Sequence, residues 1–210
     1  MTTDSSPRIL LGLVASVFAM AMLIYGASFV EAAWRFAQAE PRYAEVAHGK
    51  AATVVELDAL TRVLRGSPMR ADLSRSAYIQ VLAAQQQGLK TAHSATRMFA
   101  ARKDLHAGLS ASPSDSYAWT RLAIAEYRLA DTGRAAAALS MALQIAPAER
   151  KLMALQLDLA LMLWPDLDNA GRAAVERRLN EGRKWPDLVR VLEGNSAVAL
   201  RAKIESMHRP

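Results

Sequence analysis

The residue types that carry out chemistry in proteins are few and scattered in this sequence. There is no cysteine, which excludes disulfides, thiolate metal sites and a cysteine nucleophile. The four histidines, His48, His93, His106 and His208, stand singly, without the three- or four-residue spacing that places two metal ligands on one helix face. No glycine-rich loop that could cradle a phosphate is present either. The sequence therefore predicts no metal site, no cofactor and no enzyme activity.

The tetrapeptide Trp-Pro-Asp-Leu occurs twice, at residues 164–167 and 185–188. Proline at a first helical position and aspartate in the first turn favour helix initiation, so we interpret both copies as helix starts. Asp166 and Asp168 then sit at an exposed helix start and do not form an acid–base pair. Each tryptophan would staple the new helix to the one just ended, and a ligand-stacking role is the alternative.

Positive charge is concentrated between residues 61 and 110, where the only acidic residues are Asp72 and Asp104. Beside Lys90, seven basic residues are candidates for contact with an anionic surface: Arg62, Arg65, Arg70, Arg75, Arg97, Arg102 and Lys103. Near anionic lipid each is worth about 1 kcal/mol, but we favour the alternative of a solvated helix face. Only Tyr78 and Phe99 could stack on bases here, so no nucleic-acid partner is expected.

A second basic group occurs near the C-terminus. Its members are Arg177, Arg178, Arg183 and Lys184, and Glu176 and Glu181 lie among them at helical pairing distance. We interpret this group as a solvated helix face.

The longest apolar stretch, Ile9–Val30, has 22 residues without a charge. About 20 apolar residues are enough to cross a membrane as a helix. Tyr25 and Trp34 suit the head-group level, and we expect Pro41 to end the helix. The predicted organisation is a tail over residues 1–8, a membrane helix with its extension over 9–40 and a helical domain over 41–210, with residues 9–30 contacting lipid.

Two questions about this segment have alternatives. Ala37-Gln38-Ala39 resembles a signal-peptide cleavage site, but the apolar run exceeds the usual length of such peptides, and we favour an uncleaved anchor. Counting basic residues on the two flanks favours a cytoplasmic domain. That rule weakens for long domains, and a short tail before a single span commonly leads to export of the downstream domain. We therefore expect a single pass through the inner membrane, with the domain on the periplasmic side.

Small residues recur along one side of the predicted span, at Gly12, Ser16 and Ala19. Such residues let another membrane helix approach closely. They are candidates for a helix–helix contact within the membrane.

Downstream of Ala51, apolar residues recur every three or four positions, as in amphipathic helices, and no strand-type alternation appears. Glycine- and proline-containing breaks divide the region into seven or eight helices with short loops. Three sets of apolar residues mark successive helix faces: Leu57, Leu60 and Leu64; Leu73, Ala77, Val81 and Ala84; and Met98, Leu105 and Leu109. We expect antiparallel helical hairpins in an all-α fold behind one N-terminal transmembrane helix.

One stretch carries a more specific pattern over two expected helices. The first helix has a large residue followed by two apolar residues. The second has two small residues, and a proline comes after it. The residues are Trp119, Leu122, Ala123, Ala135, Ala142 and Pro147. This spacing resembles a tetratricopeptide repeat. Glu126 and Leu139 depart from it, since the family usually has aromatic residues there. Pro113 lies one 34-residue period earlier, with Ala101 and Gly108 at small-residue positions of an upstream unit.

The resemblance implies a short stack of hairpins that presents a groove to a partner protein or an extended peptide. Membrane-anchored proteins that look like this serve bacterial envelope machines, including polysaccharide assembly, cytochrome maturation and secretion. A permanent accessory subunit of a larger membrane complex is the alternative.

Overall fold

The computed structural model describes residues 6–67, 69–70, 72–88, 91–185 and 193–207, with side chains described from Val14 to Ser206. Within these ranges every regular element is helical, which confirms the predicted all-α class. The chain divides into two compact units. The first runs to Ala51 and includes Gly66–Pro68, and the second comprises Ala52–Arg65 and the chain from Met69 onward.

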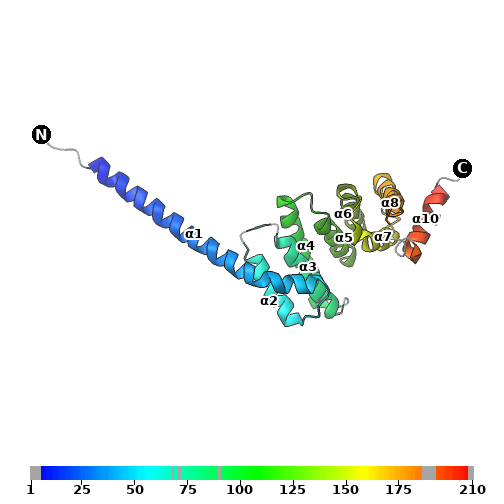
Figure 1. The fold of residues 1–210 in the computed structure, drawn as a ribbon, viewed down its shortest axis with the longest axis horizontal. Coiled ribbons are helices and arrows are strands. Elements are labelled where there is room, and N and C mark those ends of the chain that lie inside the picture. The colour runs from blue at the N-terminus through cyan, green and yellow to red at the C-terminus, as the bar shows by residue number, and fades with distance from the viewer. Residues whose placement is uncertain (1–5, 68, 71, 89–90, 186–192, 208–210) are drawn as a thin grey trace. The chain divides into compact units, whose positions relative to one another are not determined.

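The first unit is dominated by the 42-residue helix α1, Ser6–Ala47 (Figure 1). Its large apolar side chains between Val14 and Val30 are exposed, whereas Tyr43 and Val46 near its end are buried; Phe18 and Leu23, for example, have 64% and 69% of their surface accessible. From Val14 onward the helix is long and apolar enough to cross a membrane. Pro7 lies in its first turn, where the missing N–H would have no partner anyway.

The expectation that Pro41 ends this helix is wrong, because α1 continues through Pro41 to Ala47. Proline fits the helical φ angle and removes only one donor, the one that would bond the carbonyl of Ala37. Beyond Pro41, Arg42 pairs with Glu45 at 2.8 Å, one helical turn away. The predicted boundary between residues 40 and 41 therefore falls inside a continuous helix, and the helix begins three residues before Ile9.

The second unit is a succession of helices, and Figure 1 labels its α-helices. They are α2 (Val54–Arg65), α3 (Asp72–Gln86), α4 (Ala92–Ala111), α5 (Ser116–Arg128), α6 (Thr132–Ile145), the 3-10 helix η1 (Arg150–Leu152), α7 (Met153–Met162), α8 (Asn169–Gly182) and α10 (Asn195–Met207). From α2 to α6 each helix packs on the next, α6 also packs on α8, and α7 packs on α10. Short loops between packed neighbours produce antiparallel hairpins.

Side-chain caps define several of the helix starts. Asp115, Asp131 and Asp168 each accept a hydrogen bond from the backbone N–H three residues later, at the beginnings of α5, α6 and α8. Thr53 and Glu56 form a reciprocal capping box at the start of α2. Each such cap stabilises its helix by about 1 kcal/mol.

The predicted apolar faces are buried in the second unit, except at Leu73, which is half-buried. Leu57 and Leu64 of α2, Ala77 of α3 and Leu105 of α4 are at most 1% exposed. Between α3 and α4 the backbones approach closely at Gly108, where an added Cβ would overlap Ser74 Oγ and lie 3.1 Å from the Ser74 backbone nitrogen. Glycine is therefore required for this approach.

The interpretation of the Trp-Pro-Asp-Leu segments as helix starts is wrong for the first copy. Trp164 and Pro165 lie in the turn that follows α7, and α8 begins only at Asn169, capped by Asp168. Proline just beyond a helix C-terminus prevents its continuation, which is the role Pro165 has here. The Trp164 side chain is buried in the core. In the second copy Trp185 follows the end of α8, and residues 186–188 lie outside the described ranges.

The interpretation of the C-terminal basic group as a solvated face is wrong for Arg178, which is 1% exposed. Its guanidinium donates to the backbone carbonyls of Ala146, Pro147 and Glu149, immediately after α6. Burial lowers the pKa of Arg178, yet an arginine stays charged in proteins. A positive charge at the carbonyl end of a helix is favourable, and this offsets part of the burial cost.

Candidate functional site

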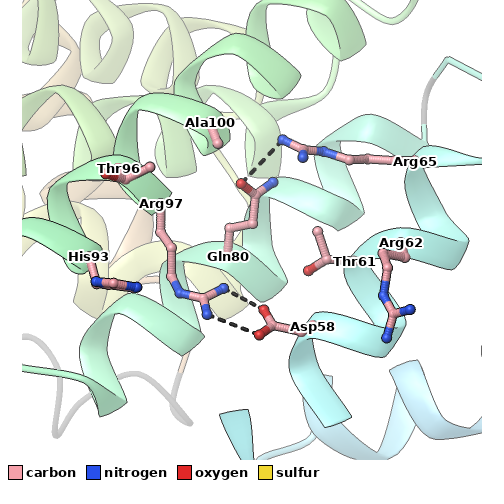
Figure 2. Close-up of a pocket in the computed structure, with 9 residues that line it drawn as sticks. All are labelled: Asp58, Thr61, Arg62, Arg65, Gln80, His93, Thr96, Arg97 and Ala100. Carbon is pink, nitrogen blue, oxygen red and sulfur yellow. Dashed lines mark hydrogen bonds and ion pairs between the residues drawn. The ribbon is translucent and has the colours of Figure 1, made fainter. Parts of the chain in front are cut away.

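An open groove of ≈ 740 Å³ lies in the second unit between α2 and α4, with α3 contributing Gln80 (Figure 2). Helix α2 lines it with Asp58, Thr61, Arg62 and Arg65, and α4 lines it with His93, Thr96, Arg97 and Ala100. Its volume is in the range of pockets that bind ligands in proteins. Two arginine–aspartate pairs join its walls, and they determine its electrostatics.

The first pair is a two-pronged contact between Arg97 of α4 and Asp58 of α2. The two terminal guanidinium nitrogens donate to the two carboxylate oxygens at 2.5 and 3.1 Å, as Figure 2 shows. Arg97 Nε also donates to Gln87 Oε1 at 2.9 Å, which fixes the plane of the guanidinium. These hydrogen bonds lower the pKa of Asp58 and raise that of Arg97, so both groups are charged at neutral pH.

The second pair runs in the opposite direction, from Arg65 of α2 to Asp104 of α4, with Arg65 Nε 2.8 Å from Asp104 Oδ2. The same oxygen accepts hydrogen bonds from Ser76 Oγ at 2.9 Å and from Gln80 Nε2 at 2.7 Å. The Asp104 side chain is 9% exposed, and Gln80 and Ser76 are buried. This pair therefore belongs to a satisfied polar network within the core.

The two pairs are reciprocal, because each joins residues 39 positions apart and each helix contributes one arginine and one aspartate. On both helices the two charged residues are two turns apart and so share a face. The register Asp58 with Arg97 and Arg65 with Asp104 requires α2 and α4 to run in the same direction, as alternate helices of a hairpin stack do. We call these two contacts the reciprocal clasps.

Positive charge exceeds negative charge around the groove. Three arginines, Arg62, Arg65 and Arg97, line the groove, whereas Asp58 is the one acidic residue among the described lining residues and Asp104 pairs with Arg65. The clasps account for two of them, and Arg62 is an exposed cation that contributes only a minor electrostatic effect on Asp58. The groove therefore carries one positive charge more than the two clasps neutralise.

The seven predicted surface-contact residues do not form one surface. Arg62, Arg65 and Arg97 line the groove. Arg75 lies 3.8 Å from Asp72, and Arg102 lies 3.5 Å from Glu126. Arg70 and Lys103 are exposed elsewhere, and Lys90 lies outside the described residues.

The residues of the predicted repeat lie in the hairpin formed by α5 and α6 and in its following loop. Leu122, Ala123, Ala135 and Ala142 are buried. Trp119 is half-buried against the core, and its indole N–H donates to the Pro113 carbonyl at 2.8 Å. Pro147 follows the end of α6.

Glu126, at a usually aromatic position of the repeat, is 1% exposed. Its carboxylate faces Arg102 at 3.5 Å and His106 at 3.8 Å, both from α4. The departure from the repeat pattern is therefore matched by a charged partner on the preceding hairpin.

The small residues of the predicted span lie on α1, with Ser16 and Ala19 exposed. Gly12 belongs to the same helix but precedes the first described side chain. Among the described residues no group of three or more histidines and carboxylates is placed to hold a metal ion. Comparisons with family models, curated proteins and solved structures find no match to this chain.

The reciprocal clasps are the feature that sequence reasoning missed. A signal for them exists, because opposite charges two turns apart on one helix, Asp58 and Arg65, are mirrored on another by Arg97 and Asp104. Matching these pairs requires knowing that α2 and α4 are alternate helices that face each other.

Proposed function

We propose that this chain is a membrane-anchored scaffold of the tetratricopeptide-repeat type, which holds a partner protein in the groove between α2 and α4. The observation that carries the proposal is the open groove of ≈ 740 Å³ within a stack of helical hairpins. Binding grooves of helical-repeat proteins need no catalytic group, only a rigid frame and specific polar contacts. We place the protein in a bacterial inner membrane, with the second unit on the periplasmic side, serving an envelope assembly process.

The rigid frame is supplied by the network around Asp104. Three donors converge on one buried carboxylate oxygen from α2 and α3, and the carboxylate itself belongs to α4. Hydrogen bonds to charged groups contribute about 1.5–3 kcal/mol each, so the three helices are fixed relative to one another. A preformed groove avoids the entropic cost of ordering itself on binding.

Site-directed photocrosslinking tests the scaffold function in the native membrane. A crosslinking amino acid at Thr96, on the groove wall, should attach to a partner protein, whereas one at Arg177, exposed on α8, should not. Mass measurement of the detergent-extracted particle then gives the partner's mass and stoichiometry. A particle with the mass of the chain alone, without a crosslink at Thr96, contradicts the proposal.

A permanent accessory subunit is the second candidate, and the exposed Ser16 and Ala19 on α1 favour it. Replacement of residues 9–30 by an unrelated apolar helix distinguishes the two functions. A scaffold keeps its Thr96 crosslink after the exchange. An accessory subunit that depends on contacts within the membrane dissociates from its complex.

A further inference from the structure

We propose that the groove binds an acidic segment of the partner, and that Asp58 occupies on Arg97 the place that a carboxylate of this segment takes. The inference rests on the proposed scaffold function and specifies the chemistry of what the scaffold holds. It follows from three observations: the surplus charge of the groove, the unequal exposure of the two members of the first clasp, and the different construction of the second.

The surplus charge selects against a basic or neutral ligand. A carboxylate that enters the groove meets Arg62, which is exposed, and Arg65, whose side chain is 41% exposed although its Nε is committed to Asp104. Among the described lining residues the only acidic one, Asp58, is already neutralised by Arg97. Complementary potentials of this kind favour an anionic partner and suppress cationic ones.

Asp58 is the more exposed member of the first clasp. Its side chain is 42% exposed, whereas that of Arg97 is 17% exposed and is also held by Gln87. Because water already reaches the Asp58 carboxylate, separating this pair costs less than separating a fully buried pair. When an incoming carboxylate takes the guanidinium, Asp58 rotates into water and the number of charge-assisted hydrogen bonds to Arg97 is preserved.

The second clasp stays in place during this exchange. Asp104 is buried and accepts three hydrogen bonds, so its displacement would remove the carboxylate acceptor of both Ser76 Oγ and Gln80 Nε2 in the core. Unsatisfied buried polar groups cost about 1–3 kcal/mol each. One clasp therefore maintains the frame, and the other exchanges its carboxylate.

Inorganic phosphate and anionic lipid share the negative charge of an acidic segment. One water needs only roughly 10–15 Å³ of such space, so a small ion would fill little of the groove of ≈ 740 Å³. A side-chain carboxylate also reproduces the group that Asp58 places on Arg97. We therefore commit to a protein segment and treat the other two anions as outcomes of the test.

The test uses the full chain in phosphatidylcholine nanodiscs and a fluorescent hexaglutamate peptide with blocked termini, with hexaglutamine as the control. Anisotropy should show binding of hexaglutamate alone, and the binding should weaken with added salt. Arg62→Gln should weaken it about threefold to tenfold. Arg128→Gln removes the same charge from an exposed position on α5 and should change it less than about twofold.

Asp58→Asn should have the opposite effect. The variant removes the carboxylate that competes for Arg97, so hexaglutamate should bind about threefold to tenfold more tightly. If Asp58 had only a structural role, affinity would fall or stay unchanged. Circular dichroism checks that the variant is folded, and Arg62→Gln keeps the proposal testable if it is not.

Four results would overturn the proposal: no binding of hexaglutamate, equal losses in Arg62→Gln and Arg128→Gln, no gain in a folded Asp58→Asn, or Arg62-dependent binding only of inorganic phosphate or phosphatidylglycerol vesicles. A Thr96 crosslink without hexaglutamate binding would retain the scaffold and reject its acidic ligand. Absence of both the Thr96 crosslink and hexaglutamate binding would reject the scaffold function as well.

Discussion

Alternate helices of the second unit are joined in two different ways, and the difference lies in the size of the residues between them. Between α2 and α4, long charged side chains span an open groove of ≈ 740 Å³. At α6 and α8, Gly171 lies so close to Ser140 that an added Cβ would overlap the Ser140 hydroxyl. The space beside Arg178 is only ≈ 10 Å³, about one water.

Arginine has a different role in each of these joints. Arg97 is held by a partly exposed carboxylate, which an external carboxylate can replace. Arg178 is held by backbone carbonyls of the loop that follows α6, and a main-chain carbonyl cannot rotate away as a side chain can. A buried arginine therefore indicates an exchangeable site only when its acceptor is itself a mobile side chain.

The largest expected effect is the loss of Arg178. Arg178→Ala leaves carbonyls at the end of α6 without their donor and opens a cavity, so the free energy of unfolding should fall by about 3–5 kcal/mol. Urea unfolding of the full chain in detergent, followed by circular dichroism, measures it. Arg177→Ala, at the exposed neighbouring position, should change it by less than about 0.5 kcal/mol. Similar losses in both variants would show that the α6–α8 joint does not depend on this buried charge.

A smaller effect is expected from adding a side chain at the close contact between α6 and α8. Gly171→Ala places a Cβ against Ser140 Oγ and 3.0 Å from Asp168 Oδ1 and Leu167 Cδ2, so these side chains or α8 must shift, and the free energy of unfolding should fall by about 1–3 kcal/mol. The same urea titration measures the change. Ser140→Gly in the same chain should restore part of the loss because it removes the overlapping hydroxyl. Gly133→Ala, which meets nothing within 4 Å, is the matched control. If Gly171→Ala left the free energy of unfolding unchanged, the contact between α6 and α8 would not be tightly packed at this position.

The smallest effect on stability is expected from loss of the ion pair between Asp58 and Arg97 at the groove. Arg97 lowers the pKa of Asp58 in the folded protein, so the clasp contributes stability above the unfolded pKa of about 3.9 and loses it as the pH falls through the lower folded value. Because Asp58 is 42% exposed, Asp58→Asn should cost at most about 1 kcal/mol at neutral pH. Urea titrations at several pH values should show the two proteins converging in acid. A constant difference at all pH values would argue against the ion pair as its source.

The apolar faces of the helices are predictable from sequence, whereas the contacts between alternate helices are not. Leu57, Leu60 and Leu64 reveal a buried face because helical periodicity depends only on local spacing. Trp164-Pro165 misleads because proline suits both the start of a helix and the position after its end, and only the packing of Trp164 distinguishes the two. Pro41 misleads because the loss of one donor does not by itself end a long helix.

The groove residues are recognisable as basic from sequence, but their partners are not. Arg62, Arg65 and Arg97 belong to a basic segment that sequence alone favours as a solvated surface, and pairing with Asp58 and Asp104 depends on which helices face each other. Arg178 has no sequence signature, because its acceptors are main-chain oxygens around 30 residues away in the chain. Interactions with backbone atoms leave no trace in residue type.

The spacing of the reciprocal clasps also limits the length of partner segment that the groove can recognise. Two helical turns measure about 11 Å along the axis, which an extended chain covers with about three residues. A recognition sequence that short supports only a brief encounter in free solution. Confinement of both molecules to one membrane would raise their local concentration, so an anchor in the same membrane should govern occupancy as strongly as the groove itself.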